Sequence, residues 1–212
     1  PVQHSSGRAM AVETATIHIV DDDEAFRNSV QWLLESVGMN VLVHGSAADF
    51  LGIVNTDTVG CLITDVRMPG MSGLELQRAM RTDEIDLPVI VMTAHGDVDT
   101  AVQAMKDGAM DFVEKPFKDQ FFLDKVNAAV AASVQRSEAR HFRVGLERRI
   151  ASLSARESEV LNLIVAGNTN KATAKKLGLA EKTVEAHRAN IMQKTRANSL
   201  VELVKMVVTV RN

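Results

Sequence analysis

Four aspartates follow directly on short apolar runs of the sequence. Asp21, Asp22 and Asp23 come after the run 16–20, and Asp65 comes after the run 60–64. Like charges gathered in one cleft repel each other, so such a cluster needs a bound cation or raised pKa values. A few hard oxygen ligands suit Mg²⁺ or Mn²⁺ better than a soft metal. The pattern therefore predicts a divalent cation site.

Two further polar residues stand at the ends of later apolar runs, Thr93 after the fourth and Lys115 after the fifth. A carboxylate nucleophile, a divalent cation, a hydroxyl and an ammonium group are what a phosphoryl-transfer site needs, because catalysis there depends on positioning and charge neutralisation. Each residue alone has an ordinary explanation: an Asp run often caps a helix, Asp65 could open a turn, Thr is a common strand residue and a lone Lys is usually solvated. Their joint placement favours phosphoryl transfer.

Five short apolar runs would bring these side chains together. They are too short for helices and lack strict alternation, as expected of parallel strands covered on both faces, and they lie at 16–20, 40–44, 60–64, 88–92 and 109–113. Helix-period segments lie between them, with starts marked by Ser46, Ser72 with Glu75, Asp97 and Asp119, and stops by Gly38 and Gly108. Five such units predict a doubly wound, five-stranded parallel α/β sheet with its ligand site at the carboxyl ends of the strands.

The residues around these positions resemble the receiver domain of bacterial two-component response regulators, over about residues 15–135. The strings that carry the resemblance are Val20 to Asp23, Ile63 to Gly73, Met92 to Gly96 and Phe112 to Phe117. The resemblance implies a flavodoxin-like or CheY-like fold. It also implies that a sensor histidine kinase transfers a phosphoryl group to Asp65.

The same resemblance assigns further roles by position. Asp22, Asp65 and the backbone carbonyl of Arg67 would hold Mg²⁺, with Asp21 contributing through water. Lys115 would pair with the phosphoryl oxygens, Thr93 would move to hydrogen-bond them, and the Phe112 ring would follow Thr93. The Lys115–Pro116 peptide is expected to be cis, which X-Pro bonds tolerate at modest cost.

The sign of the charge changes along the chain. The formal net charge of the 212 residues is −3, yet residues 14–135 hold 19 acidic and 8 basic side chains, whereas residues 136–212 hold 7 and 15. A basic domain is the usual electrostatic footprint of nucleic-acid binding. The split predicts two domains with different partners, and it suggests the hypothesis that the acidic domain covers the basic one until phosphorylation.

The basic part contains four helix-period segments, at about 155–166, 169–177, 181–194 and 199–210. Ser154 with Glu157 forms a capping box for the first, and Gly178 separates the second from the third at the spacing of a helix-turn-helix. The third segment turns Val184 and Ile191 inward. Its other side chains are the candidate DNA contacts: Lys182, Thr183, Glu185, His187, Arg188 and Lys194.

This part resembles the LuxR-type (NarL/FixJ) DNA-binding domain over about residues 150–210, and the whole chain is most similar to the FixJ-like subgroup. The strings that carry it are Leu153 to Leu161, Asn170-Lys171, Leu177 to Leu179, Lys182 to Val184, His187 to Met192 and Ser199 to Leu203. Four positions depart from the family: Ala180 replaces a helix cap, Thr173 and Thr195 replace aliphatic residues, and Glu185 stands where many members have Lys. We therefore expect reduced stability and do not transfer base preferences.

The expected organisation is an added, disordered segment at 1–13, a receiver at 14–135, a helical linker at 136–150 and a small all-α DNA-binding domain at 151–212. The expected function is a DNA-binding response regulator whose phosphorylation switches dimerisation and promoter binding, with RNA polymerase as a further candidate partner. It is not expected to be an enzyme beyond Mg²⁺-dependent self-phosphorylation and slow autodephosphorylation at Asp65. One cysteine, Cys61, in an apolar run and the lack of a long apolar stretch favour the bacterial cytoplasm and no membrane partner.

Two alternatives remain open. The second domain could bind protein or RNA instead of DNA. The chain could also be an Mg²⁺-dependent phosphatase with an Asp nucleophile, although Arg67 occupies the place where such an enzyme usually carries a second Asp as general acid.

Overall fold

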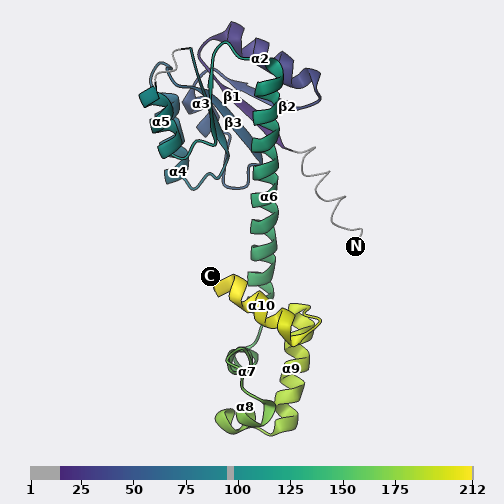
Figure 1. The fold of residues 1–212 in the computed structure, drawn as a ribbon. Helices are drawn as coiled ribbons and strands as arrows, with labels where there is room; N and C mark the ends of the chain where they lie inside the picture. The colour runs from purple at the N-terminus through teal and green to yellow at the C-terminus, as the bar shows by residue number, and fades with distance from the viewer. Residues whose placement is uncertain (1–14, 95–97, 212) are drawn as a thin grey trace. The chain divides into compact units, whose positions relative to one another are not determined.

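A computed structural model describes residues 15–94 and 98–211 of the chain, which divides into two compact units after Ser137 (Figure 1). The predicted segment 1–13, the His95-Gly96 pair of the receiver resemblance and the predicted helix start at Asp97 lie outside the described residues. Across the ranges that the structure covers, no helix combines the length and the apolar character needed to cross a bilayer.

The first unit contains a five-stranded sheet in the order β2-β1-β3-β4-β5, with every neighbouring pair parallel. The strands are β1 (Thr16–Val20), β2 (Asn40–His44), β3 (Gly60–Asp65), β4 (Val89–Thr93) and β5 (Asp111–Glu114). The predicted doubly wound sheet is confirmed. The fifth strand begins two residues later than predicted, because Ala109 closes the preceding helix by donating its backbone N–H to Ala104 O over 2.9 Å.

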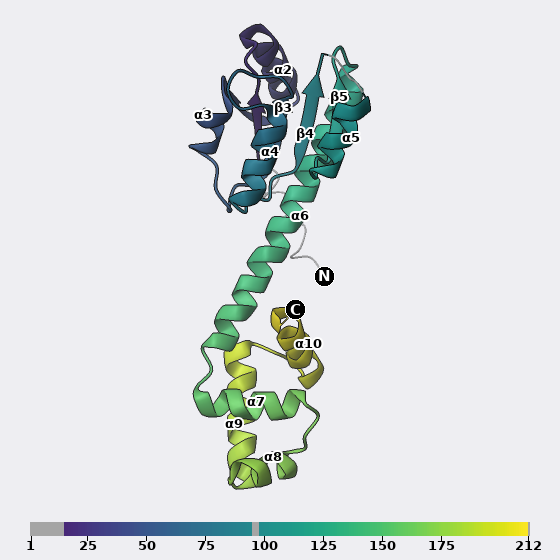
Figure 2. The ribbon, with the colours of Figure 1, turned by 90° about the vertical axis from the view of Figure 1, so that its left-hand side faces the viewer.

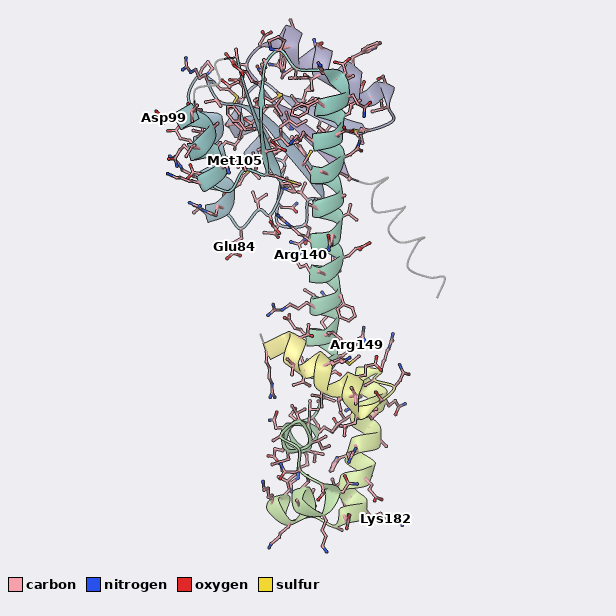
Figure 3. The ribbon with its side chains drawn as sticks, in the orientation of Figure 1. Glu84, Asp99, Met105, Arg140, Arg149 and Lys182 are labelled. Carbon is pink, nitrogen blue, oxygen red and sulfur yellow. The ribbon has the colours of Figure 1, made fainter. Side chains whose placement is uncertain are left out.

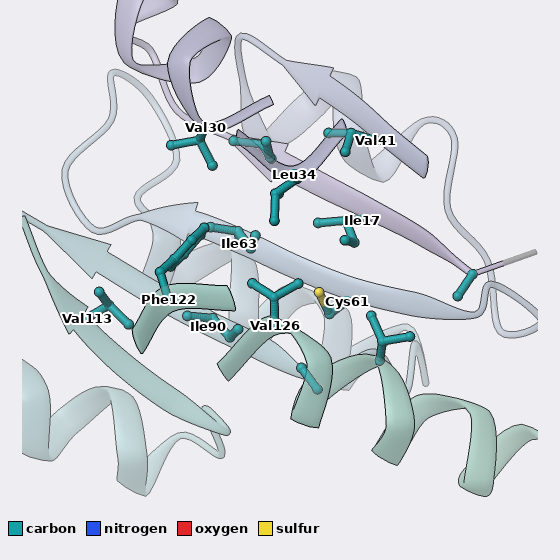
Figure 4. Close-up of a cluster of buried hydrophobic side chains, with 14 of the residues drawn as sticks. Ile17, Val30, Leu34, Val41, Cys61, Ile63, Ile90, Val113, Phe122 and Val126 are labelled. Carbon is teal, nitrogen blue, oxygen red and sulfur yellow. The ribbon is translucent and has the colours of Figure 1, made fainter. Parts of the chain in front are cut away.

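Helices cover both faces of this sheet. They are α2 (Glu24–Ser36), α3 (Ala47–Leu51), α4 (Gly73–Thr82), α5 (Val98–Lys106) and α6 (Asp119–Ala151). One core packs α2 and α6 on the sheet, with Leu34, Phe122 and Val126 fully buried among strand residues (Figure 4). Cys61 lies in this core, where burial raises its pKa to about 12, as expected of a packing residue. The other core packs α3, α4 and α5 on the opposite face.

Local signals account for the ends of these elements. Ser46 caps α3, and Ser72 with Glu75 forms the predicted capping box of α4. Gly60 opens β3 with φ of +146°, and a Cβ there would stand 1.7 Å from the backbone oxygen of Thr16 in the neighbouring strand. Only glycine allows β1 and β3 to pair at this point.

The second unit is helical. It consists of the last turns of α6 with α7 (Ala155–Val165), α8 (Asn170–Leu177), α9 (Glu181–Thr195) and α10 (Leu200–Arg211). Figure 2 shows α7 crossing α9 and α8 lying near one end of α9, and both helices contact α9. Gly178 ends α8 in the left-handed conformation, which gives the tight turn of a helix-turn-helix.

The last turns of α6 belong to the core of the second unit. Leu146 is 1% exposed in the cluster that includes Val160, Val184 and Ile191. Arg149, labelled in Figure 3, donates from Nη1 to the carbonyl oxygen of Thr195 at the end of α9, over 3.3 Å. The predicted helical linker is therefore the C-terminal part of one helix, and its end caps another.

Candidate functional site

Two aspartates and a lysine meet at the carboxyl edge of the sheet. Asp21 follows β1, Asp65 ends β3 and Lys115 follows β5. The Lys115 ammonium lies 2.6 Å from Asp21 Oδ2 and 2.7 Å from Asp65 Oδ1. Parallel strands place all three residues at this edge, so Lys115 contacts Asp21, 94 positions before it in the sequence, and Asp65, 50 positions before it.

Backbone groups and an arginine hold the two carboxylates in place. Asp65 Oδ2 accepts from the backbone N–H of Arg67 over 2.6 Å, and Asp21 Oδ1 accepts from that of Asp23 over 2.9 Å. Arg27 of α2 donates from Nη1 to the backbone carbonyl of Asp21. Asp21 is 1% exposed and Asp65 is 9% exposed, so Asp65 is the more accessible of the two.

The other predicted residues lie on the same sheet or close to these residues in the sequence. Thr93 ends β4 and is buried, and its carbonyl accepts from Lys115 N over 2.8 Å. Phe112 is half-buried on β5, while Asp22 and the Arg67 side chain are exposed. The Lys115–Pro116 peptide is cis, as predicted.

Asp23 has a different place from its two neighbours. Its side chain caps α2 by accepting from the backbone N–H of Phe26 over 3.1 Å. The ordinary explanation for an aspartate run, a helix cap, is thus correct for Asp23. The sequence did not distinguish it from Asp21 and Asp22, because all three precede the first turn of the helix.

Two residues of α2 near the site were not foreseen. The Phe26 ring lies under the Lys115 ammonium, 3.7 Å from it, and Arg27 clamps the Asp21 backbone. A cation over an aromatic face is attracted by the ring quadrupole. Their position in the sequence could have predicted this, because the first turn of a helix that follows a strand directly lies beside the residues at the carboxyl end of that strand.

The donor set fits a hard divalent cation, although among the described residues no three His, Cys, Asp or Glu side chains are grouped as a metal cluster. Asp21 and Asp65 already face one cationic group, and exposed Asp22 lies next to Asp21 in the chain. Carboxylate and carbonyl oxygens are the ligands that Mg²⁺ prefers. The residues that would hold it are Asp21, Asp22, Asp65 and the carbonyl of Arg67.

This arrangement suits phosphoryl transfer to a carboxylate. Asp65 is a partly accessible carboxylate with its oxygens fixed by Lys115 and the Arg67 N–H. An ammonium and a hydroxyl stand at the ends of neighbouring strands, where added phosphoryl oxygens would need donors.

A second candidate site lies on α9. Val184 and Ile191 are fully buried, as predicted, and Lys182, Thr183 and Glu185 are exposed. His187 is half-buried. Lys182 lies in the first turn of α9, the part of a recognition helix that contacts base edges (Figure 3).

Two predicted DNA contacts of α9 are bound within the unit. Arg188 donates from Nη1 to Asn170 Oδ1 at the start of α8. The Lys194 ammonium lies 2.7 Å from Glu157 Oε2. Glu157 is 4% exposed, and its hydrogen bonds with Lys194 and the Ser154 backbone lower its pKa to about 2. Both basic residues thus brace α9 against its neighbours.

The exposed surface of α9 includes four residues that were not among the candidates: Ala186, Ala189, Asn190 and Gln193. They recur three or four positions after Lys182 and after one another, which is the spacing of one helix face. That spacing could have identified them, but two are alanines, which have no polar side-chain group that would mark them as DNA contacts.

Comparison with known proteins assigns both units. Residues 17–127 match the family model described as the response regulator receiver domain, and residues 151–207 match the model described as bacterial regulatory proteins of the luxR family. A receiver domain implies a sensor kinase as partner, and the LuxR-type domain implies DNA binding.

Relatives match over almost the whole chain. The transcriptional regulatory protein FixJ of Azorhizobium caulinodans is 47% identical over 194 residues, which is 92% of each chain. The structure of the response regulator StyR aligns with a TM-score of 0.85 at 42% identity, covering 92% of this chain and 98% of that one. Full-length FixJ from B. japonicum aligns with a TM-score of 0.56 at 38% identity, covering 93% and 97%. This chain belongs to the FixJ/NarL-type response regulators, which are DNA-binding transcription regulators that join a receiver to a LuxR-type domain.

Proposed function

We propose that Asp65 is the phosphoacceptor of this transcription regulator. The observation that carries the proposal is the convergence of Asp21 and Asp65 at the carboxyl edge of the sheet, each within 2.7 Å of the Lys115 ammonium. A carboxylate oxygen of Asp65 forms a bond to phosphorus while the bond between phosphorus and the imidazole nitrogen of the kinase breaks. The donor histidine leaves with its electron pair and takes up a proton.

Lys115 and Thr93 donate hydrogen bonds to the new phosphoryl oxygens. Lys115 already contacts Asp65 Oδ1, so its ammonium lies beside the position of the added phosphoryl group, and Thr93 ends the neighbouring strand β4. Mg²⁺, or Mn²⁺, held by Asp21, Asp22, Asp65 and the Arg67 carbonyl would neutralise charge on the phosphoryl group. Phe112, half-buried on β5, is the proposed aromatic that changes position with Thr93.

The proposed output is a change in dimerisation and promoter binding. Helix-turn-helix proteins usually bind as dimers to two half-sites about one helical turn apart. Apolar side chains exposed on α5 support self-association, namely Val98 at 75%, Val102 at 43% and Met105 at 49%. The proposed DNA contacts are Lys182, Thr183, Glu185, His187, Arg188 and Lys194. The site of action is the bacterial cytoplasm, where promoter DNA lies, and RNA polymerase is a further partner.

Neither alternative function is favoured. The match to the LuxR-type family argues against an output domain that binds protein or RNA. Arg67, exposed beside Asp65, offers no carboxyl group as general acid for a phosphatase.

The phosphoacceptor is tested by labelling with acetyl phosphate and Mg²⁺. Asp65→Asn should incorporate no label, because an amide cannot form the acyl phosphate, and the wild-type label should be released by hydroxylamine. Asp83→Asn, an exposed residue at the end of α4, is the matched control and should label normally. Wild-type labelling of Asp65→Asn would contradict the proposal.

The output is tested by selecting bound duplexes from a random pool, with and without beryllofluoride as phosphoryl mimic. The expected result is a two-fold symmetric site that is enriched more strongly with the mimic. If wild type and Asp65→Asn enrich the same duplexes to the same extent, both with and without beryllofluoride, phosphorylation control is refuted.

A further inference from the structure

The outward face of α9 carries unusually short side chains at its centre. Val184, Ile191 and Thr195 define the buried side of the helix. The residues on the opposite side, spaced by three or four positions, are Lys182, Ala186, Ala189 and Gln193, and all are exposed. Two methyl groups in the middle of this face let the helix backbone approach a surface closely, as in the major groove of DNA.

Glu185 borders this face and its carboxylate is unpaired. It is exposed, and within the described part of the chain it has no hydrogen bond or ion pair. Three other glutamates of the same unit form ion pairs, Glu147 with Arg143, Glu157 with Lys194 and Glu159 with Arg156, whereas Glu138 and Glu181 likewise have no partner among the described residues. An unpaired carboxylate on a surface that meets phosphates is repelled unless it finds a donor there.

The next arginine on the same helix does not pair with Glu185. Arg188 follows it by three positions, a spacing at which opposite charges on a helix pair. The Arg188 guanidinium instead donates to Asn170 Oδ1 at the start of α8. Glu185 therefore keeps its acceptor oxygens free for a donor outside the protein.

Among base edges in the major groove, cytosine is the one that suits a carboxylate. Its N4 amino group is a donor, whereas the adenine amino group stands beside the N7 acceptor, which repels a carboxylate. We propose that Glu185 is a specificity-determining residue that accepts a hydrogen bond from the N4 amino group of a cytosine in each half-site. This inference rests on the proposed DNA-binding function of α9.

The test compares the full chain, phosphorylated with acetyl phosphate, as wild type, Glu185→Gln and Glu159→Gln. Glu159 is an exposed glutamate of α7, so its variant removes the same charge away from α9. Each protein selects duplexes from a random pool. Affinities are then measured for the wild-type site, for the site with its selected cytosine exchanged for each other base, and for the site with a pyrimidin-2-one base, which lacks the amino group.

Wild type should require cytosine at one position per half-site and lose roughly 5- to 100-fold in affinity on exchange or on removal of the amino group. Glu159→Gln should show the same losses. Glu185→Gln should lose less than about threefold, or prefer adenine there, since glutamine pairs with adenine N6 and N7.

The outcomes separate the inference from the function on which it rests. If wild type enriches no sequence, DNA binding fails and the inference falls with it. If wild type enriches a site but Glu185→Gln keeps the full cytosine penalty, the DNA-binding function stands and the role of Glu185 is overturned.

Discussion

Two threonines in the core of the second unit differ in how their hydroxyl groups are satisfied. Thr173 on α8 is 0% exposed, and in the described part of the chain its Oγ1 has no hydrogen-bond partner. Thr195 at the end of α9 is 1% exposed, and its Oγ1 donates to the carbonyl oxygen of Ile191 over 2.7 Å. Their departure from the LuxR-type pattern led us to expect that both weaken the domain. The geometry indicates that only Thr173 lowers its stability.

Thr173→Val should raise the free energy of unfolding of the second unit by about 1 kcal/mol, because it removes a buried hydroxyl that has no partner. Thr195→Val should lower it by about 1 kcal/mol, because a formed hydrogen bond is lost. Urea denaturation followed by circular dichroism measures both. The one tryptophan, Trp32, lies on α2, so its fluorescence identifies the transition of the first unit separately. Equal effects of the two variants would refute the distinction.

A second residue-scale feature is the histidine pair in the first unit. His18 of β1 and His44 of β2 are buried, with His18 Nδ1 and His44 Nε2 3.1 Å apart. Burial, and then the neighbouring His44, lower the pKa of His18 to about 4. The unfolded chain, with a pKa near 6.5, therefore binds the proton more readily than the folded one. His18 thus favours folding above pH 6.5 and this contribution is lost as the pH falls toward 4.

His18→Leu should make the stability of the first unit less dependent on pH between about 6.5 and 4. The slope should fall by at most about 1.4 kcal/mol per pH unit, the value for one proton. Urea titrations at several pH values, followed by Trp32 fluorescence, give the slope. His141→Gln, at an exposed position of α6, is the control and should leave the slope unchanged. An unchanged slope in His18→Leu would show that His18 is not the group responsible.

At the scale of elements, α9 differs from the helices around it at its first residue. Ser154 caps α7 and Thr169 caps α8 through their side chains, whereas Ala180 gives α9 no side-chain cap, as the sequence predicted. Its C-terminus is better held, because Arg149 donates to the carbonyl of Thr195. The end of α9 proposed to contact bases is therefore the less stabilised one.

Ala180→Ser should stabilise the second unit by about 1 kcal/mol, since a hydroxyl at this position can accept from a free N–H of the first turn. Ala186→Ser, an exposed interior position of α9, is the control and should give no gain, because serine is a poorer helix former than alanine. The comparison uses the circular dichroism transition of the second unit. Stabilisation of similar size by both variants would refute the capping explanation.

At the scale of the whole molecule, the second unit begins earlier than the sequence suggested. The chain divides after Ser137, and Leu146 and Arg149 lie within the segment 136–150 that was expected to be a linker. The formal charge pattern did not reveal this, because Arg and Glu dominate that segment and conceal its few core residues.

A fragment of residues 138–212 should therefore be more stable than one of residues 151–212. The difference should be about 3 kcal/mol, because the shorter fragment lacks the buried Leu146 side chain and the Arg149 hydrogen bond. Denaturation of the two fragments by urea measures this. A long fragment with Leu146→Ala should lie between them, and equal stability of the two fragments would place Leu146 outside the core.

The longer fragment can also test the hypothesis that the acidic unit covers the basic one before phosphorylation. That hypothesis stays a prediction. It requires residues 138–212 alone to bind the selected duplex more tightly than the unphosphorylated full chain.

The sequence determined the strand runs, most helix ends and the residue types that meet at the candidate site, because these follow from local periodicity, caps and the rule that parallel strands end at one edge. Tertiary structure decided which of three consecutive aspartates faces Lys115, since that depends on a contact with a residue 94 positions away. The cap of α2 is instead a local contact, between Asp23 and the backbone N–H of Phe26. Tertiary structure also decided that Arg188 and Lys194 brace α9, while Glu185 has no partner among the residues that the structure describes. Pairing of charges depends on distances across helices, and residue types alone do not contain those distances.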